Sequence, residues 1–151
     1  MPVVRVYLPV GLAELDGLAE SGVIVGGPAS PRAAFAVTDE LARRAPGADT
    51  EALEFAAFAD AVEAAGGAGG GTRRVVAALD ADPAWLAPYD GGPESRVSLT
   101  QAVPVSRVAS FHIDEADGSP GEAEADPADS GAADMLWYDV TELDEVRSLL
   151  G

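Results

Sequence analysis

The sequence contains neither cysteine nor lysine, and each absence excludes a class of function. Without cysteine the chain has no disulfide framework, no thiolate nucleophile and no cysteine-ligated metal site, so its stability must come from packing. Its nine basic residues are all arginines, and 26 acidic residues bring the net charge to -17. Phosphate backbones and anionic lipids are bound by clustered basic side chains, so we expect no nucleic acid and no membrane as a partner.

Long apolar runs and export signals are also missing. No apolar run approaches the roughly 20 residues that a membrane-spanning helix needs. The N-terminal segment MPVVRVYLPV has neither a basic leader nor a small-residue cleavage site, so we expect the protein in the cytoplasm. Lysine and asparagine are absent while alanine, glycine, proline and arginine are abundant, which is the composition that a GC-rich genome produces.

The acidic residues are unevenly distributed. Residues 1–107 hold fourteen of them with eight arginines, whereas residues 108–151 hold twelve with only Arg147. Residues 115–134 consist of aspartate, glutamate, alanine, glycine, serine and proline, and they offer no large side chain whose burial could offset the entropy lost on ordering. Because larger apolar residues return after this stretch, we expect one domain over 1–151 with a disordered acidic insertion at 115–134.

Apolar periodicity predicts the main elements of the fold. It indicates either an edge strand or a buried loop at 23–25, and strands at 3–10, 33–37, 75–79, 97–103, 108–113 and 135–140. Helical spacing beside polar caps indicates helices that begin after Gly11, Thr38, Asp49 or Thr50, and Thr141. The short connection between 97–103 and 108–113 predicts that these two strands pair as an antiparallel hairpin.

These elements predict a single α+β domain. Two main helices and a short C-terminal helix are expected to pack on one face of a mostly antiparallel five- or six-stranded sheet. Much of the apolar content is alanine, which buries little area, so the larger side chains must supply the core. The residues expected in that core are Leu15, Leu18, Phe35, Phe55, Phe58, Val75, Trp85, Phe111 and Trp137.

His112 is the only histidine and the only side chain whose ordinary pKa suits proton transfer near neutral pH. It shares a strand face with Ser110 and is followed by Asp114, so these three residues are the candidate catalytic set. The GxSxG pattern of an activated serine is absent. The competing interpretation is a solvent-facing histidine on an ordinary strand. One histidine without cysteine does not supply a zinc site.

Asp80 and Asp82 end the apolar run VVAALDAD and are the candidate metal ligands. Two carboxylates at the end of a strand can share a divalent cation with a substrate phosphate, but aspartate is also common where a strand ends in a turn. The glycine cluster at 66–71 lacks the GK[ST] ending of a phosphate-binding loop, so we interpret it as a connector. We expect no cofactor.

Three aromatic residues, Tyr7, Trp137 and Tyr138, are candidate binding residues. Trp137 and Tyr138 are adjacent in a predicted strand and therefore point to opposite faces of the sheet. One of them should lie in the core and the other should be partly exposed. An exposed aromatic side chain can anchor a ligand or a partner protein, although single exposed aromatics are common in proteins.

Six segments carry a resemblance that extends over nearly the whole chain apart from the glycine connector, residues 81–95 and the acidic insertion. They are VRVYLP at 4–9, AFAVTDEL at 34–41, EALEFAAFADA at 51–61, RRVVAALD at 73–80, AVPVSRVASFHIDE at 102–115 and DMLWYDVTEL at 134–143. In these segments the chain resembles an uncharacterised family of small actinobacterial proteins, a domain of unknown function. The resemblance implies an actinobacterial, cytoplasmic protein of one domain, and it brings no catalytic residues.

The function stays open between different classes. We predict a non-enzymatic binding or regulatory module that acts through a protein partner or self-association, using a strand edge or the face that bears Tyr7 and Tyr138. The alternative is a small hydrolase or transferase that uses His112 with Asp114, or a divalent cation at Asp80 and Asp82. In a third interpretation the acidic insertion imitates nucleic acid and occupies a basic partner.

Overall fold

β1 (Val4–Val10) is an interior strand of the main sheet and pairs antiparallel with β3 (Arg32–Ala36) on one side and β4 (Val75–Ala81) on the other. The computed structural model describes residues 3–24, 27, 29, 31–68, 73–89, 91–114 and 135–150. The acidic insertion expected at 115–134 and the end of the glycine connector at 69–72 lie outside these described residues.

The main sheet has seven strands in the order β5-β6-β3-β1-β4-β8-β9, and all neighbours are antiparallel. The remaining strands are β5 (Leu86–Pro88), β6 (Arg96–Leu99), β8 (Val108–Ile113) and β9 (Leu136–Asp139). The predicted single-domain α+β fold is confirmed. The sheet exceeds the expected five or six strands because β5 forms within residues 81–95, where three residues ending in proline are too short to show an alternating pattern.

A second sheet replaces the expected hairpin. It consists of β2 (Val23–Ile24) paired with β7 (Val103–Pro104), so the strand predicted at 97–103 is divided between β6 and β7. The predicted pairing of 97–103 with 108–113 is wrong. Both edges of β6 are occupied by β3 and β5, and both edges of β8 are occupied by β4 and β9.

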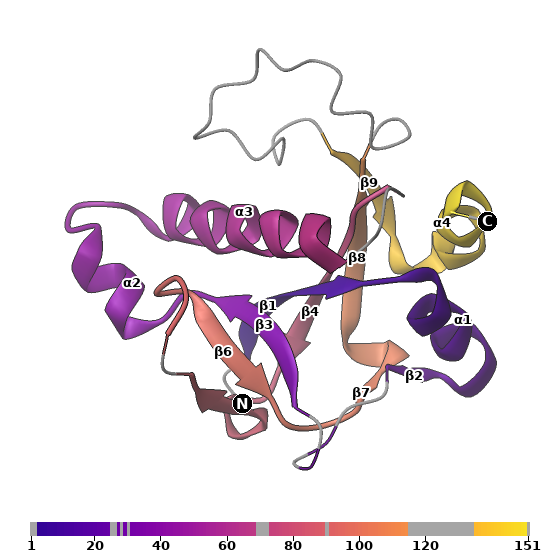
Figure 1. The fold of residues 1–151 in the computed structure, drawn as a ribbon, viewed down its shortest axis with the longest axis horizontal. Helices are drawn as coiled ribbons and strands as arrows, with labels where there is room; N and C mark the ends of the chain where they lie inside the picture. The colour runs from indigo at the N-terminus through magenta and orange to yellow at the C-terminus, as the bar shows by residue number, and fades with distance from the viewer. Residues whose placement is uncertain are drawn as a thin grey trace.

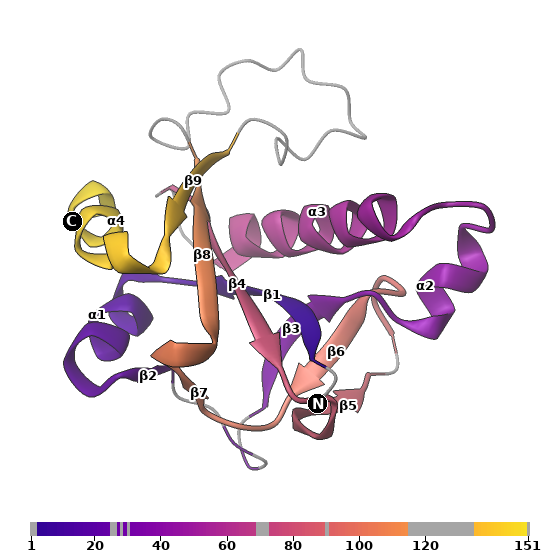
Figure 2. The same ribbon diagram turned by 180° about the vertical axis from the view of Figure 1, so that it is seen from behind.

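Helices cover both faces of the main sheet, whereas the sequence predicted one covered face. α3 (Thr50–Ala68) crosses one face, and α1 (Leu12–Ser21) and α4 (Leu143–Leu150) lie side by side on the other, as Figures 1 and 2 show. The sequence of β4 accounts for the second layer. All residues from Val75 to Leu79 are buried, because alternate side chains enter opposite cores.

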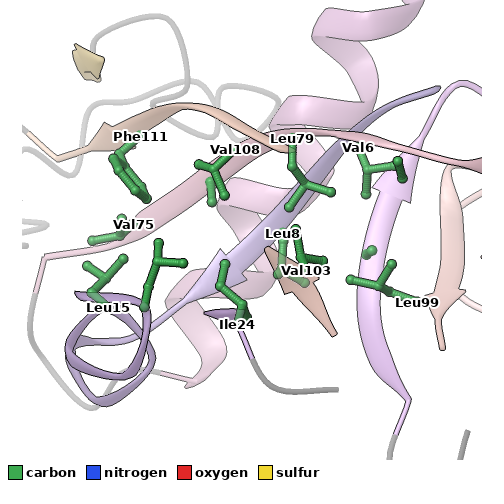
Figure 3. Close-up of a cluster of buried hydrophobic side chains, with 14 of the residues drawn as sticks. Val6, Leu8, Leu15, Ile24, Val75, Leu79, Leu99, Val103, Val108 and Phe111 are labelled. Carbon is green, nitrogen blue, oxygen red and sulfur yellow. The ribbon is translucent and has the colours of Figure 1, made fainter. Parts of the chain in front are cut away.

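The larger core lies between the sheet and the layer of α1 and α4. Leu15 and Leu18 of α1 pack there against the strands, and Phe111 of β8 is among its largest fully buried side chains (Figure 3). The smaller core lies under α3, where Phe58 and Val62 pack against Tyr7, Phe35, Val76 and Ala78. Each face of the sheet therefore has its own apolar cluster.

Two residues that the sequence assigned to the core are exposed. Phe55 is 50% exposed and Trp137 is 60% exposed, while Trp85 is only partly buried. The reason is the placement of α3, which packs over β1, β3 and β4 but leaves β8 and the edge strand β9 largely uncovered. Phe55 and Phe58 are only one turn apart on α3, but Phe58 lies inside the smaller core and Phe55 lies at its exposed edge.

Caps at the helix ends largely follow the sequence. Gly22 ends α1 with a φ of 80°, and Thr38 accepts a hydrogen bond from the amide of Leu41 at the start of α2 (Asp39–Arg44). The expected cap at Thr141 is wrong. The carboxylate of Asp139 accepts hydrogen bonds from both the amide and the hydroxyl of Thr141, because α4 is preceded by a 3-10 turn at Val140–Glu142.

Within the described residues, none of the helices combines the length and the apolar character that a membrane-spanning segment requires.

Candidate functional site

An open groove of about 520 Å³ lies between α3 and the uncovered part of the sheet. The strand register builds its floor. Tyr7, Ala78 and Ser110 lie side by side on β1, β4 and β8, and the next row places His112 beside Trp137 on β9. Since alternate residues of a strand share a face, all five side chains face the α3 side. The small side chains of Ala78 and Ser110 leave the space between Tyr7 and Trp137.

Aromatic side chains line this groove on both walls. The ring of Phe58 lies 4.8 Å from that of His112 and 5.5 Å from that of Tyr7, measured between centroids. Phe55 continues the row at 6.2 Å from Phe58. Tyr7 and Phe58 are buried, whereas Phe55 and Trp137 are at least half exposed. The outer aromatic pair therefore presents apolar surface that a bound molecule can cover.

His112 and Ser110 form a polar pair at the floor of the groove. Nε2 of His112 and Oγ of Ser110 share a hydrogen bond of 3.1 Å. Ser110 is buried and His112 is half-buried against Phe58, so the histidine does not face open solvent. Burial lowers the pKa of His112 to about 4, and the positive charge of Arg5 acts in the same direction. The imidazole is therefore neutral at pH 7.

The charged residues of the groove lie on opposite walls. On the sheet, Nε of Arg5 donates a hydrogen bond of 2.9 Å to Oδ1 of Asp80, its partner in the strand register. On the helix, Glu51 and Glu54 line the groove. Burial raises the pKa of the Tyr7 phenol, and the charge of Glu54 raises it further. Because Arg5 and Asp80 compensate each other, the two glutamates leave the groove with an excess of negative charge.

Asp114 of the candidate catalytic set is held by Arg74. Its Oδ1 accepts a hydrogen bond of 2.9 Å from Nη2 of Arg74, while its Oδ2 accepts from Nε at 2.9 Å and from the backbone amide at 2.7 Å. These bonds raise the pKa of the Arg74 guanidinium. Among the described residues, the hydrogen-bond partner of His112 is Ser110, and no carboxylate orients the imidazole.

The candidate metal ligands are engaged separately. Asp80 binds Arg5, whereas Oδ1 of Asp82 accepts a hydrogen bond of 2.9 Å from the amide of Ala84 and thereby caps a 3-10 turn. In the part of the chain that the structure describes, no three His, Asp or Glu side chains are grouped so that they could hold a metal ion. The two carboxylates thus each have a structural partner.

The structure separates the two neighbouring aromatics of β9 as their alternation predicted. Tyr138 is partly buried against the larger core, while Trp137 is exposed in the groove on the opposite face. The predicted common face of Tyr7 and Tyr138 is therefore wrong, because Tyr7 belongs to the smaller core on the α3 side of the sheet. Sequence reasoning missed the contribution of α3. The spacing of Glu51, Glu54 and Phe55 with Phe58 puts all four on one helical face, and this mixture of acidic and aromatic residues was the available signal.

The chain matches DUF6912, a family of unknown function, over residues 4–146. Neither a curated protein nor a solved structure matches the chain.

Proposed function

The chain belongs to DUF6912, a family of unknown function, and we propose that it is a non-enzymatic binding module for a partner protein. In this proposal, the groove takes up a basic side chain of the partner together with the apolar residues that flank it. One observation carries the proposal. The exposed rings of Phe55 and Trp137 line the same open groove as the carboxylates of Glu51 and Glu54.

This combination suits an ammonium or guanidinium group. A cation over an aromatic face gains about 0.5–1 kcal/mol at an exposed site and about 2 kcal/mol when water is excluded. Carboxylates add charge-assisted hydrogen bonds to the same group. Apolar residues on either side of the cation would cover the rings of Phe55 and Trp137, which supplies the hydrophobic part of the binding energy.

The protonation state of His112 supports a cationic ligand. With a pKa of about 4, the imidazole carries no charge at pH 7 and does not repel a cation in the groove. The imidazole also shares a hydrogen bond with the hydroxyl of the buried Ser110, so this hydroxyl keeps a partner when a ligand displaces water from the groove. The pair therefore serves as a neutral floor beneath the aromatic walls.

The charge of the whole chain favours a basic partner over a second copy. Two molecules that each carry a net charge of -17 repel one another, whereas a partner with clustered basic residues is attracted and steered toward the surface. Self-association through the groove is accordingly an outcome that the binding test must distinguish.

The hydrogen bond between Ser110 and His112 also favours the alternative of a small hydrolase. Against it, a histidine with a pKa of about 4 is a weak general base at neutral pH, and Asp114 is bound to Arg74. Turnover of an activated ester such as p-nitrophenyl acetate that disappears in both Ser110→Ala and His112→Gln would support this alternative over the binding module.

The binding proposal is tested with short fluorescent peptides that carry one central lysine or arginine between leucines. Fluorescence anisotropy measures their affinity for the wild type and for Trp137→Ala. Tyr89→Ala is the matched control, since it truncates a 46% exposed aromatic residue outside the groove. Peptides with a central glutamate or glutamine test the need for a cation. Analytical ultracentrifugation of each sample reports any self-association.

We expect saturable binding of the basic peptides, weakened about 10- to 30-fold by Trp137→Ala and unchanged by Tyr89→Ala. Equal affinity for basic and acidic peptides would refute the choice of ligand. An unchanged affinity in Trp137→Ala would refute the choice of surface. Dimers of the wild type that dissociate in Trp137→Ala would replace the basic partner with a second copy of the chain.

We also propose, from composition and from the resemblance described above, an actinobacterial source and a cytoplasmic location. The excess of acidic residues supports the absence of nucleic acid from the set of partners. Fractionation of the native host followed by detection of the chain would test the location, and recovery in the membrane or the medium would contradict it.

A further inference from the structure

We propose that the partner segment binds as an antiparallel β-strand added to the outer edge of β9, a proposal that rests on the binding function of the groove. β9 is the last strand of the main sheet, so among the described residues only its β8 side is paired within that sheet. Figures 1 and 2 show β9 between α3 and α4. The outer side of such a strand presents backbone N–H and C=O groups with which an extended segment of another protein can pair.

The hydrogen bonds of β8 show which way its backbone groups point. The amide of Asp114 donates to the carbonyl oxygen of Arg74 at 3.1 Å, and these two residues continue the register of β8 with β4. Backbone groups of successive residues in an antiparallel strand point to opposite sides. His112 therefore also faces β4 with its N–H and C=O, whereas Phe111 and Ile113 face β9.

The register of β9 carries this alternation to the edge of the sheet. Tyr138 lies opposite Phe111, and Leu136 lies opposite Ile113. Tyr138 and Leu136 therefore exchange backbone hydrogen bonds with β8. Trp137 lies between them, so its N–H and C=O point away from β8, while its side chain lines the groove. A strand that pairs with Trp137 consequently also brings side chains to the groove.

The opposite edge of the main sheet is less suited to pairing. The amide of Thr100 donates to the carbonyl oxygen of Trp85 at 2.8 Å, and these residues continue the register of β6 with β5. By the same alternation, the backbone of Pro88 in β5 faces outward. Proline has no N–H to donate, and it is one of the means by which proteins protect exposed sheet edges. Residues 136–139 contain no proline, so β9 lacks this protection.

An antiparallel direction of the added strand fits the chemistry of the groove. In an antiparallel pair, the residue directly opposite Trp137 exchanges both backbone hydrogen bonds with it, and the two side chains lie on the same face. A lysine or arginine at this position lies beside the indole ring and extends toward the carboxylates of Glu51 and Glu54, which line the same groove. Backbone pairing thus places the cation where the charge is complementary.

The other face of the added strand favours apolar residues. The two neighbours of the basic residue point to the α4 side, where Leu136 and Tyr138 are partly buried against the larger core. Residues two positions away return to the groove side, where they can cover the exposed ring of Trp137. The preferred segment is therefore one lysine or arginine within an otherwise apolar, extended stretch.

The test uses the lysine peptide of the binding assay and two analogues, each with one N-methyl group on its backbone. In the proposed pairing, the N–H of the lysine donates to the carbonyl oxygen of Trp137, whereas the N–H of the next residue points away from β9. N-methylation of the lysine removes this hydrogen bond and places a methyl group between the strands. N-methylation of the next residue is the matched control. Both changes are in the peptide, so the fold of the protein is not altered.

In fluorescence anisotropy, we expect N-methylation of the lysine to weaken binding about tenfold or more and N-methylation of the next residue to change it less than about twofold. Equal affinity of the two analogues would overturn strand addition but leave the groove as the binding site. The reverse order of affinities is the pattern of a parallel strand and would overturn the antiparallel pairing. Absence of binding by the unmodified peptide would overturn both this proposal and the function proposed for the groove.

Hydrogen exchange measured by ¹⁵N NMR gives a second readout, on the protein itself. Saturating lysine peptide should slow exchange of the Trp137 amide about tenfold or more and change that of the Tyr138 amide, which already bonds to β8, less than about twofold. Unchanged exchange at Trp137 in the saturated complex would overturn the proposal. Protection of this amide that rises with protein concentration in the absence of peptide would overturn the choice of occupant, because the edge would then pair with a second copy of the chain.

Discussion

Acidification from pH 7 to pH 5 is expected to destabilise the protein through its single histidine. An unfolded chain holds its histidine at a pKa of about 6.5, whereas burial in the groove lowers the pKa of His112 to about 4. Between these two values the unfolded state binds a proton that the folded state does not. The free energy of unfolding therefore falls as the pH falls. The contribution of neutral His112 to the free energy of unfolding is fully present above about pH 6.5 and is lost progressively as the pH falls to about 4.

The size of the loss follows from the two pKa values. A difference of about 2.5 in pKa corresponds to about 3.4 kcal/mol, and roughly half of it, about 1.8 kcal/mol, is lost between pH 7 and pH 5. His112 lies at an open groove and keeps some contact with solvent, which screens the interaction with Arg5. We therefore expect a loss of about 1 kcal/mol from this group.

Urea unfolding at pH 7 and pH 5 measures the loss, and His112→Gln is the control. Acidic residues titrate in both proteins, so the difference between the two pH dependences isolates the histidine. NMR supplies a direct check, because the imidazole of the only histidine needs no assignment among others. A histidine pKa of 6 or higher, or equal pH dependence in the wild type and His112→Gln, would refute the argument for a neutral groove floor.

Three further perturbations separate the parts of the structure. Phe58→Ala should lower the free energy of unfolding by about 3–5 kcal/mol, whereas Phe55→Ala should lower it by about 1 kcal/mol, because only Phe58 is buried. Equal losses for the two variants in urea unfolding would place Phe55 in the core. Asp114→Asn should cost about 2 kcal/mol in the same assay by weakening the ion pair with Arg74, and an unchanged midpoint would contradict this. Burial raises the pKa of Asp60, and the 2.6 Å hydrogen bond that Oγ of Ser95 donates to its carboxylate lowers it. Ser95→Ala removes this bond and should therefore raise the pKa of Asp60 further. A carboxyl ¹³C titration that shows a lower pKa in the variant would contradict this.

Short-range patterns in the sequence predict most elements but not their partners. The alternation in residues 3–10 and the cap at Thr38 are local, and both appear in the structure as expected. The hairpin between 97–103 and 108–113 failed because proximity along the chain was its only support. In the structure, β6 pairs with β3 and β5 while β8 pairs with β4 and β9, so neither strand has an edge left for the other.

The second helix layer shows a similar limit. A continuous apolar run such as Val75 to Leu79 is what a strand covered on both faces requires, so its sequence held the signal for helices on both sides. Periodicity alone cannot separate such a strand from one that is merely rich in alanine and valine. β4 is covered on both faces because it lies inside the sheet, between β1 and β8, and this strand order is not visible in the local sequence.

The groove depends on strand order more than on any motif. Tyr7, Ser110, His112 and Trp137 could each be singled out from the sequence, but they share one site only because β1, β4, β8 and β9 are neighbours in register. In a helical projection Phe55 lies on the same face as Phe58, one turn away, and the sequence pattern therefore assigns it to the core. Its exposure arises because the sheet extends past the helix at β8 and β9, strands that come from the last third of the chain. A long-range property of the fold thus exposes an aromatic side chain that the local pattern assigns to the core, and the binding function proposed for the groove relies on this exposure of Phe55.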